Sequence, residues 1–202
     1  MYLYADGEKE FLYEHLLNDW LLVGFMQETQ DKEIVRYINQ TGLFKSADVG
    51  EIFYYPLTYC RSVEAKNRVM FVKTKKPKTY TQLKDIIRIL ENVPFVSFAN
   101  LVFKGKKFSD AQVDNPNLVM SFSSFFHVCV NDKNDLSDLY AVTQETGTRI
   151  ICQLENWKEW FFLDTDENAK GNAIQVANYF YETGKFKYAY PDFILKTVNI
   201  NK

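Results

Sequence analysis

Two short stretches of this sequence resemble each other and indicate how the chain folds: TGLFKSAD at residues 41–48 and TGKFKYAY at residues 183–190. Apolar residues recur at helical spacing in front of each stretch. Glycine is the preferred residue just past the end of a helix, where the left-handed conformation is needed. Each copy therefore predicts an amphipathic helix, a glycine at its C-terminal end and then an apolar strand. A chain that repeats this phrase is expected to consist of repeated helix-to-strand units.

The composition indicates a folded protein without a strong electrostatic preference for nucleic acid or membranes. The chain has 202 residues, of which 47% are hydrophobic and 16% aromatic, so it can bury a core of one domain or two small ones. Its formal net charge is −2, which gives no electrostatic case for binding nucleic acid or an anionic membrane. We find no apolar run near the roughly 20 residues of a membrane-spanning helix.

The order of periodic segments predicts the fold. The second half is expected to contain, in order, a strand at 124–130, a helix at 135–145, strands at 148–154 and 160–164, a helix at 171–183 and a strand at 186–195. This β-α-β-β-α-β order is the split pattern of ferredoxin-like folds. The first half fits the same order with markers at Trp20, Ile34, Phe44, Val69, Leu83 and Phe95.

We therefore predict an α+β protein with two ferredoxin-like units in tandem, whose antiparallel sheets carry helices on one face. The predicted boundaries are 1–108 for the N-terminal unit, 109–122 for a polar linker and 123–202 for the C-terminal unit.

The sequence offers little for catalysis. It contains two histidines, and His127 alternates within an apolar strand, which is typical of a packed side chain. We find no clustered ligand spacing for a metal and no phosphate-binding glycine loop. Asp132, Asp135, Asp164 and Asp166 fit turn and helix-capping roles better than acid–base work. We expect no enzyme and no cofactor, and a small-molecule enzyme would need a pocket that gathers His127 with carboxylates.

The cysteines allow one disulfide at most. Cys60, Cys129 and Cys152 are an odd number without CxxC spacing, so a disulfide framework is not expected. Cys129 and Cys152 both lie in apolar, strand-like runs, where cysteine behaves as a small buried hydrophobic residue. Whether these two residues pair is left open by the sequence.

One family resemblance covers most of the chain. Residues 171–184, GNAIQVANYFYETG, lead into FKYAYPDF at residues 186–193. This stretch resembles the end of the N-terminal prodomain of Bacteroides-type subtilisin-like serine proteases, where a helix ending in Tyr-Glu-Ser/Thr-Gly precedes a Phe-x-x-Ala-x-Pro-Asp strand. The opening stretch at residues 4–11, YADGEKEF, is similar to the start of those prodomains.

The resemblance implies a role without catalysis. Such prodomains act as intramolecular chaperones and temporary inhibitors, with a sheet face on the protease and an extended C-terminal tail in its substrate groove. It implies a subtilisin-like protease as partner, in cis or in trans, and a secreted, periplasmic or envelope location with any signal peptide removed. The expected partner-binding residues are Tyr188, Tyr190, Phe193, Leu195, Val198 and Ile200.

This sequence departs from the family because no catalytic domain follows the Pro191-Asp192 pair. The alternative is an envelope or extracellular protein-interaction module without inhibitory activity. An exposed aromatic patch on the sheet, together with a tail that is not free, would favour that alternative.

Overall fold

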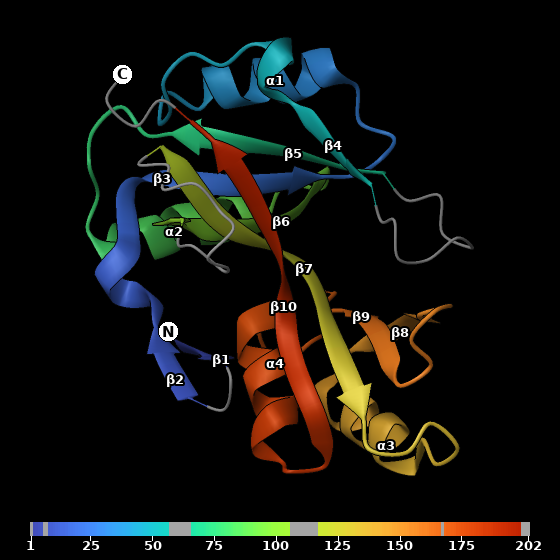
Figure 1. Ribbon diagram of the computed structural model, residues 1–202. Coiled ribbons are helices and arrows are strands. Elements are labelled where there is room, and N and C mark those ends of the chain that lie inside the picture. The colour runs from blue at the N-terminus through green and yellow to red at the C-terminus, as the bar shows by residue number, and fades with distance from the viewer. Residues whose placement is uncertain (1, 6–7, 57–65, 106–116, 167, 199–202) are drawn as a thin grey trace. The chain divides into compact units, whose positions relative to one another are not determined.

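The computed structural model describes residues 2–5, 8–56, 66–105, 117–166 and 168–198 (Figure 1). These residues form two compact units. Of the described residues, the C-terminal unit contains those within Met1–Glu14 and Phe122–Phe193, and the N-terminal unit contains those within His15–Pro56, Ala65–Ser121 and Ile194–Lys202. The divisions at Ser121/Phe122 and at Phe193/Ile194 each fall within a long strand.

The C-terminal unit confirms the predicted β-α-β-β-α-β order. Its elements are β7 (Leu118–Val130), α3 (Ser137–Thr146), β8 (Arg149–Gln153), β9 (Trp160–Asp164), α4 (Ala173–Glu182) and β10 (Phe186–Thr197). The strand order is β10-β7-β9-β8, with β9 antiparallel to both of its neighbours. This is the ferredoxin-like arrangement. Figure 1 shows α3 and α4 together behind β7 and β10, where Phe126 of β7 meets Phe180 of α4 with ring centroids 5.3 Å apart.

The N-terminal unit repeats that arrangement. Its elements are β3 (Leu16–Phe25), α1 (Asp31–Gln40), a 3-10 turn η2 (Val49–Glu51), β4 (Phe53–Pro56), β5 (Lys66–Lys73), α2 (Tyr80–Glu91) and β6 (Val96–Lys104). The strand order β4-β5-β3-β6 is again ferredoxin-like, and β3 is antiparallel to both β5 and β6. The prediction of two such units is confirmed.

An N-terminal hairpin packs on α4 of the C-terminal unit. It consists of β1 (Tyr2–Ala5) and β2 (Glu8–Phe11), and the 3-10 turn η1 (Leu12–His15) follows it. The hydroxyls of Tyr2 and Tyr4 donate to Glu182 Oε1 at 2.7 and 2.9 Å, and Asn178 Nδ2 donates to the carbonyl of Tyr2 at 2.7 Å. The bonds from the two tyrosine hydroxyls lower the pKa of the Glu182 carboxyl, because they stabilise its charged form. The sequence did not predict this hairpin.

Two helices begin at capping boxes, which explains their start points. The hydroxyl oxygen of Thr79 accepts a hydrogen bond from the backbone amide of Gln82, and the backbone amide of Thr79 donates one to Gln82 Oε1. Asn172 and Gln175 form the same pair at the start of α4. Such reciprocal bonds satisfy two amides that would otherwise lack partners in the first turn.

The repeated phrase forms the same helix ending twice. The hydroxyl of Thr41 donates to the carbonyl of Ile38 at 2.8 Å, and that of Thr183 donates to the carbonyl of Phe180 at 2.7 Å. Gly42 and Gly184 follow with φ of 68° and 70°. The prediction of a strand directly after the first copy is wrong. Phe44 makes only an isolated bridge to Thr74, and the next strand after α1 is β4. The two copies thus end different helices of their units, the first helix in one and the second helix in the other.

The compact units divide the chain differently from the predicted boundaries. The N-terminal hairpin belongs to the C-terminal unit through the Glu182 contacts. Ile194 lies in a buried cluster of the N-terminal unit, and the amide of Val198 donates to the carbonyl of Asn117 at 2.9 Å. Part of the predicted linker lies outside the described residues, and from Leu118 onward it is strand β7.

Candidate functional site

A hollow of about 460 Å³ opens on the C-terminal unit. Its lining combines aromatic rings with one carboxylate and one imidazole: His127, Leu154, Trp157, Trp160, Tyr190, Pro191, Asp192 and Phe193. These residues come from β7, the β8–β9 connection, β9 and β10. A concave site of this volume with few polar groups is the usual form of a ligand site.

Strand register places the aromatic residues on one face of the sheet. His127 of β7 lies opposite Phe162 of β9, and Cys129 lies opposite Trp160. Neighbouring residues of a strand point to opposite faces, so Phe126, which meets α4, is on the other side. The hollow therefore lies on the sheet face that the two helices leave uncovered.

Ring contacts connect the wall of the hollow. The ring of Trp160 is stacked on Tyr188 at 6.0 Å and lies 5.4 Å from Tyr190, and the Tyr190 ring lies 5.3 Å from His127. Trp157 is 60% exposed, Tyr188 55% and Tyr190 41%. Large aromatic side chains that stay this exposed on one face indicate an interaction site.

The polar base of the hollow is Asp192. The buried hydroxyl of Ser123 donates to Asp192 Oδ2 at 3.1 Å and accepts from the amide of Phe125 at 3.0 Å. His127 Nε2 lies 3.8 Å from Asp192 Oδ1, which is an ion-pair distance when the imidazole is protonated and too long for a hydrogen bond. Ser123 thus fixes the orientation of the carboxylate.

These three residues do not have the arrangement of a nucleophilic triad. Such a triad needs the serine hydroxyl to donate to the histidine, with the carboxylate behind the histidine. Here the Ser123 hydroxyl donates to the carboxylate itself, and Ser123 is fully buried. The hollow does bring His127 together with a carboxylate, as a small-molecule enzyme on this fold would require. The hydrogen bonds of Ser123, however, support the carboxylate and do not prepare the serine for nucleophilic attack.

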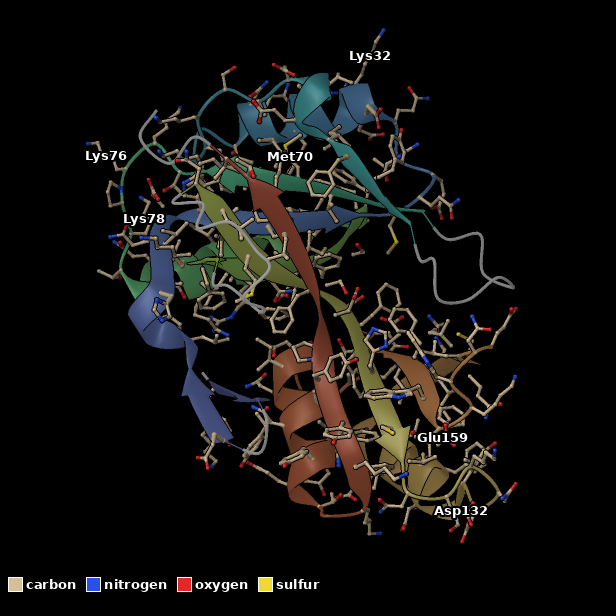
Figure 2. All side chains as sticks on the ribbon, in the orientation of Figure 1. Lys32, Met70, Lys76, Lys78, Asp132 and Glu159 are labelled. Atoms are coloured by element: carbon tan, nitrogen blue, oxygen red, sulfur yellow. The ribbon has the colours of Figure 1, made fainter. Side chains whose placement is uncertain are left out.

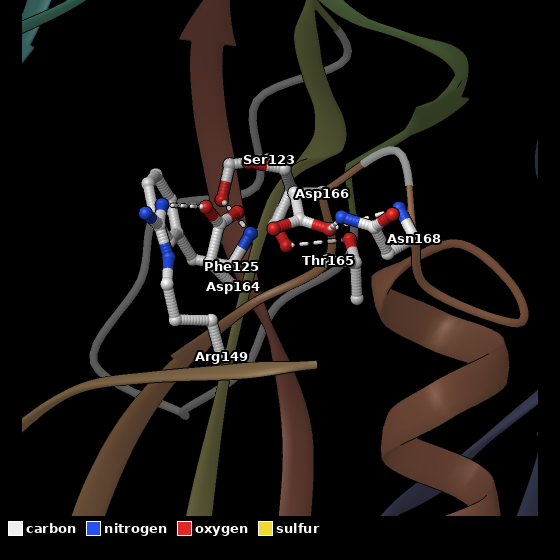
Figure 3. Close-up of polar contacts among 8 residues, drawn as sticks. Ser123, Phe125, Arg149, Asp164, Thr165, Asp166 and Asn168 are labelled. Atoms are coloured by element: carbon white, nitrogen blue, oxygen red, sulfur yellow. Dashed lines mark hydrogen bonds and ion pairs between the residues drawn. The ribbon is translucent and has the colours of Figure 1, made fainter. Parts of the chain in front are cut away.

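A second buried carboxylate lies at the opposite end of β9. Asp164 accepts a hydrogen bond from Arg149 Nη2 at 2.9 Å, and the neighbouring Thr165 hydroxyl donates to the carbonyl of Ser124 at 2.7 Å (Figure 3). Burial raises the pKa of the Asp164 carboxyl, and Arg149 acts in the opposite direction. Asp166 caps the next turn by accepting from the Asn168 amide, as predicted, whereas Asp164 is a buried strand residue and not a turn residue.

The structure spreads the predicted partner-binding residues over two environments. Tyr188 and Tyr190 belong to the aromatic wall, and Phe193 lines the hollow. Leu195 is exposed in the last part of β10, whereas Val198 packs against the buried cluster of the N-terminal unit. Ile200 lies outside the described residues. As far as Val198 the tail therefore consists of the end of β10 and a residue packed on the N-terminal unit.

Sequence reasoning missed Trp157 and Asp192 as site residues. Trp157 could have been recognised as a site residue, because it is a tryptophan in a polar connection between two strands, where burial is not expected. Asp192 was read only as part of the family phrase, and its contact with Ser123 spans 69 positions of sequence.

The cysteines have different states. Cys129 is a buried free thiol, as expected for a small core residue, and burial raises its pKa. Cys152 is disulfide-bonded. The two residues therefore do not pair with each other, and Cys60 lies outside the described residues.

Two further kinds of feature, a metal site and a membrane-spanning helix, are absent from the described residues. Within them, no group of three or more His, Cys, Asp and Glu side chains is placed to hold a metal ion. No helix in that part of the chain is both long and apolar enough to span a membrane.

Comparison with known proteins gives little. No protein-family model matches the chain, and no curated protein matches it significantly. Among solved structures, the small subunit of acetolactate synthase from Thermotoga maritima is similar, with 10% sequence identity, a TM-score of 0.29 and coverage of 90% of this chain and 97% of that chain. A likeness at this level carries no conclusion about function.

Proposed function

We propose that this protein is a non-catalytic module that binds a partner protein at the aromatic hollow of its C-terminal unit. The observation that carries the proposal is a group of aromatic rings at a concave site: the exposed Trp157 and Tyr190 and the half-buried Trp160 line it, and the exposed Tyr188 stacks on Trp160. Tryptophan and tyrosine are enriched in protein interfaces and in their energetic hot spots, because they bury much apolar area and lose little side-chain entropy.

The Cys152 disulfide supports a location outside the cytoplasm. Disulfides persist in secreted, periplasmic and cell-surface proteins and are rare in reducing compartments. Since Cys152 is bonded in this fold, an oxidising compartment fits the protein best.

The test is selection of binding peptides from a displayed random-sequence library, followed by binding to matched variants. Trp157→Ala removes an exposed ring of the hollow, and Tyr140→Ala removes an equally exposed ring from α3, both being 60% exposed. We expect Trp157→Ala to weaken binding at least about fivefold and Tyr140→Ala to leave it within about twofold. Selected peptides that bind both variants like the wild type would contradict the proposal.

A prodomain-like role is the second candidate. It is supported by the ferredoxin-like fold of Phe122–Phe193, the same stretch that resembles subtilisin-like protease prodomains. The test is inhibition of a subtilisin-like protease by the whole chain and by a chain that ends at Val198. A cut after Phe193 is unsuitable, because it removes Ile194 from a buried cluster. Inhibition that disappears without the last four residues supports a tail in the substrate groove, and no inhibition by either chain removes this candidate.

A further inference from the structure

The connection between β5 and α2 in the N-terminal unit is strongly basic. Residues 65–84 carry seven Lys and Arg and no Asp or Glu. Three of the lysines follow the end of β5: Lys75 and Lys76 are exposed, and Lys78 is half-buried. These three residues are called the basic loop below. Figure 2 shows Lys76 and Lys78 at the edge of the unit, directed away from the ribbon.

Hydrogen bonds hold the backbone of the basic loop in place. The amide of Thr74 donates to the carbonyl of Asp19 at 2.8 Å, and the amide of Lys78 donates to the carbonyl of Asn18 at 2.8 Å. Between these two points, the hydroxyl of the buried Thr74 donates to the carbonyl of Lys76 at 2.7 Å. The loop is therefore tied to β3 and to itself. A backbone that is already ordered loses less entropy when a partner binds.

The charge of the basic loop is not neutralised by the part of the chain that the structure describes. Lys73, at the end of β5, pairs with Asp19 at 3.6 Å. Within the described residues, no carboxylate lies at ion-pair distance from Lys75, Lys76 or Lys78. Helix α2 begins directly after the loop, and the N-terminal end of a helix is the positive end of its dipole. The basic loop is thus an accessible surface of one sign, which attracts an anionic partner.

We propose that the basic loop binds an acidic segment of a partner protein. Three ammonium groups match a short run of carboxylates, whereas proteins that hold nucleic acid often contact about six to ten phosphates. Residues 74–79 contain no aromatic ring on which a base could stack. They also contain no arginine, whose planar guanidinium is the side chain best suited to phosphate recognition.

The charge of the whole chain favours a short partner segment over a long polyanion. The formal net charge is −2 although it includes the three lysines of the basic loop, so the remainder of the chain is on balance negative. A short acidic segment interacts mainly with the loop, because charges farther away than about 8 Å are largely screened at physiological salt. This surface is separate from the aromatic hollow, and the inference does not depend on the proposed function.

The direct test compares two hexapeptides that differ only in charge. Acetyl-Glu-Asp-Glu-Asp-Glu-Asp-amide carries carboxylates, and acetyl-Gln-Asn-Gln-Asn-Gln-Asn-amide has neutral amides of the same shape. Binding to the full chain is followed by the backbone amide NMR signals of Lys75, Lys76 and Lys78. In about 50 mM salt we expect a saturable shift with a Kd below about 10 mM for the acidic peptide and at least about fivefold weaker binding of the neutral one. Raising the salt to about 0.3 M should weaken the acidic peptide at least about threefold.

Two double variants that lose the same charge locate the site. Lys75→Gln with Lys76→Gln removes two charges from the basic loop and should weaken the acidic peptide at least about threefold. Lys32→Gln with Arg36→Gln removes two charges from α1, where Figure 2 labels Lys32, and should leave binding within about 1.5-fold. All four side chains are exposed, so neither double variant removes a buried contact.

Three results with the peptides overturn the inference: equal binding of the two hexapeptides, no binding of either, or equal weakening by the two double variants. Two further probes test the class of partner. Heptathymidylate carries phosphate charges on a nucleic-acid backbone, and vesicles that contain phosphatidylserine present an anionic lipid surface. If either binds more tightly than the acidic peptide and the loop variant abolishes that binding, the loop is a site for nucleic acid or membrane, which overturns the acidic protein segment. Weaker binding of both supports it.

Discussion

The carboxylate of Asp192 in β10 accepts a hydrogen bond from the hydroxyl of Ser123 in β7, at 3.1 Å and across 69 positions of sequence. This contact joins the two strands at the base of the aromatic hollow. It places a charged group beside Trp160 and Tyr190 without the hydrogen-bond order that a nucleophilic serine requires.

Ser123→Ala should destabilise the fold more than Ser121→Ala. Both serines are fully buried in β7, but Ser123 donates to a carboxylate, whereas Ser121 donates to the carbonyl of Leu101 at 2.8 Å. Bonds to charged groups contribute about 1.5–3 kcal/mol and neutral ones about 1 kcal/mol. Urea unfolding of the two variants measures the difference, and equal losses would contradict a supporting role for Ser123.

Gly147→Ala should destabilise the fold more than Gly184→Ala. Both glycines follow a helix with positive φ, 68° and 70°, so each alanine pays about 1 kcal/mol for the left-handed backbone. A Cβ at Gly147 would also lie 2.3 Å from the carbonyl oxygen of Asn168, whereas a Cβ at Gly184 meets nothing within 4 Å. Thermal unfolding of the two variants tests this prediction. An equal loss of stability at Gly184 and Gly147 would contradict it and would mean that the contact between the new Cβ at position 147 and the Asn168 carbonyl is relieved at little cost.

The stability that Asp164 contributes should fall as pH rises. Its pKa is raised in the folded state, chiefly by burial, so the folded protein holds this proton more tightly than the unfolded chain. The free energy of unfolding of the wild type, relative to Asp164→Asn, should therefore decrease as pH rises from about 4, the ordinary value for aspartate, through the raised pKa.

Arg149→Met provides the check on that assignment. Removing the guanidinium that opposes burial should raise the pKa of Asp164 further and make the decrease with pH steeper. A difference from Asp164→Asn that increases with pH would contradict the assignment.

Alkylation should distinguish Cys129 from Cys152. Since Cys152 is disulfide-bonded, the chain denatured without reductant should be modified at Cys129 and remain unmodified at Cys152. The native protein should react slowly, because Cys129 is buried and burial raises its pKa, which disfavours the reactive thiolate. Peptide mass mapping with and without reductant decides this, and modification of Cys152 without reductant would remove the support for an oxidising compartment.

Local sequence signals predicted the elements well. The predicted strand at 160–164 matches β9, and Gly42, Gly147 and Gly184 follow their helices in the left-handed conformation. Helix caps and helical periodicity depend only on residues within about one turn of each other. They can therefore be recognised in a single sequence.

Features that depend on distant contacts were not predicted. Phe44 has the character of a strand residue, but tertiary pairing places the strand at Phe53–Pro56, opposite β5. The N-terminal hairpin rests on Glu182, 180 positions from Tyr2. The hollow likewise needs β10 beside β7, which brings Asp192 to Ser123, and no local pattern contains that pairing.

The most direct test of the hollow as the binding site is the NMR spectrum of the three tryptophan indoles. The chain has three tryptophans: Trp157 and Trp160 line the hollow, and the buried Trp20 belongs to the other unit and serves as an internal reference. In protein labelled with ¹⁵N-tryptophan and assigned with Trp157→Phe and Trp160→Phe, titration with a peptide selected from the displayed library should shift the Trp157 and Trp160 signals and leave Trp20 in place. A spectrum in which Trp157 and Trp160 do not move, or in which Trp20 moves as much as they do, would contradict the account.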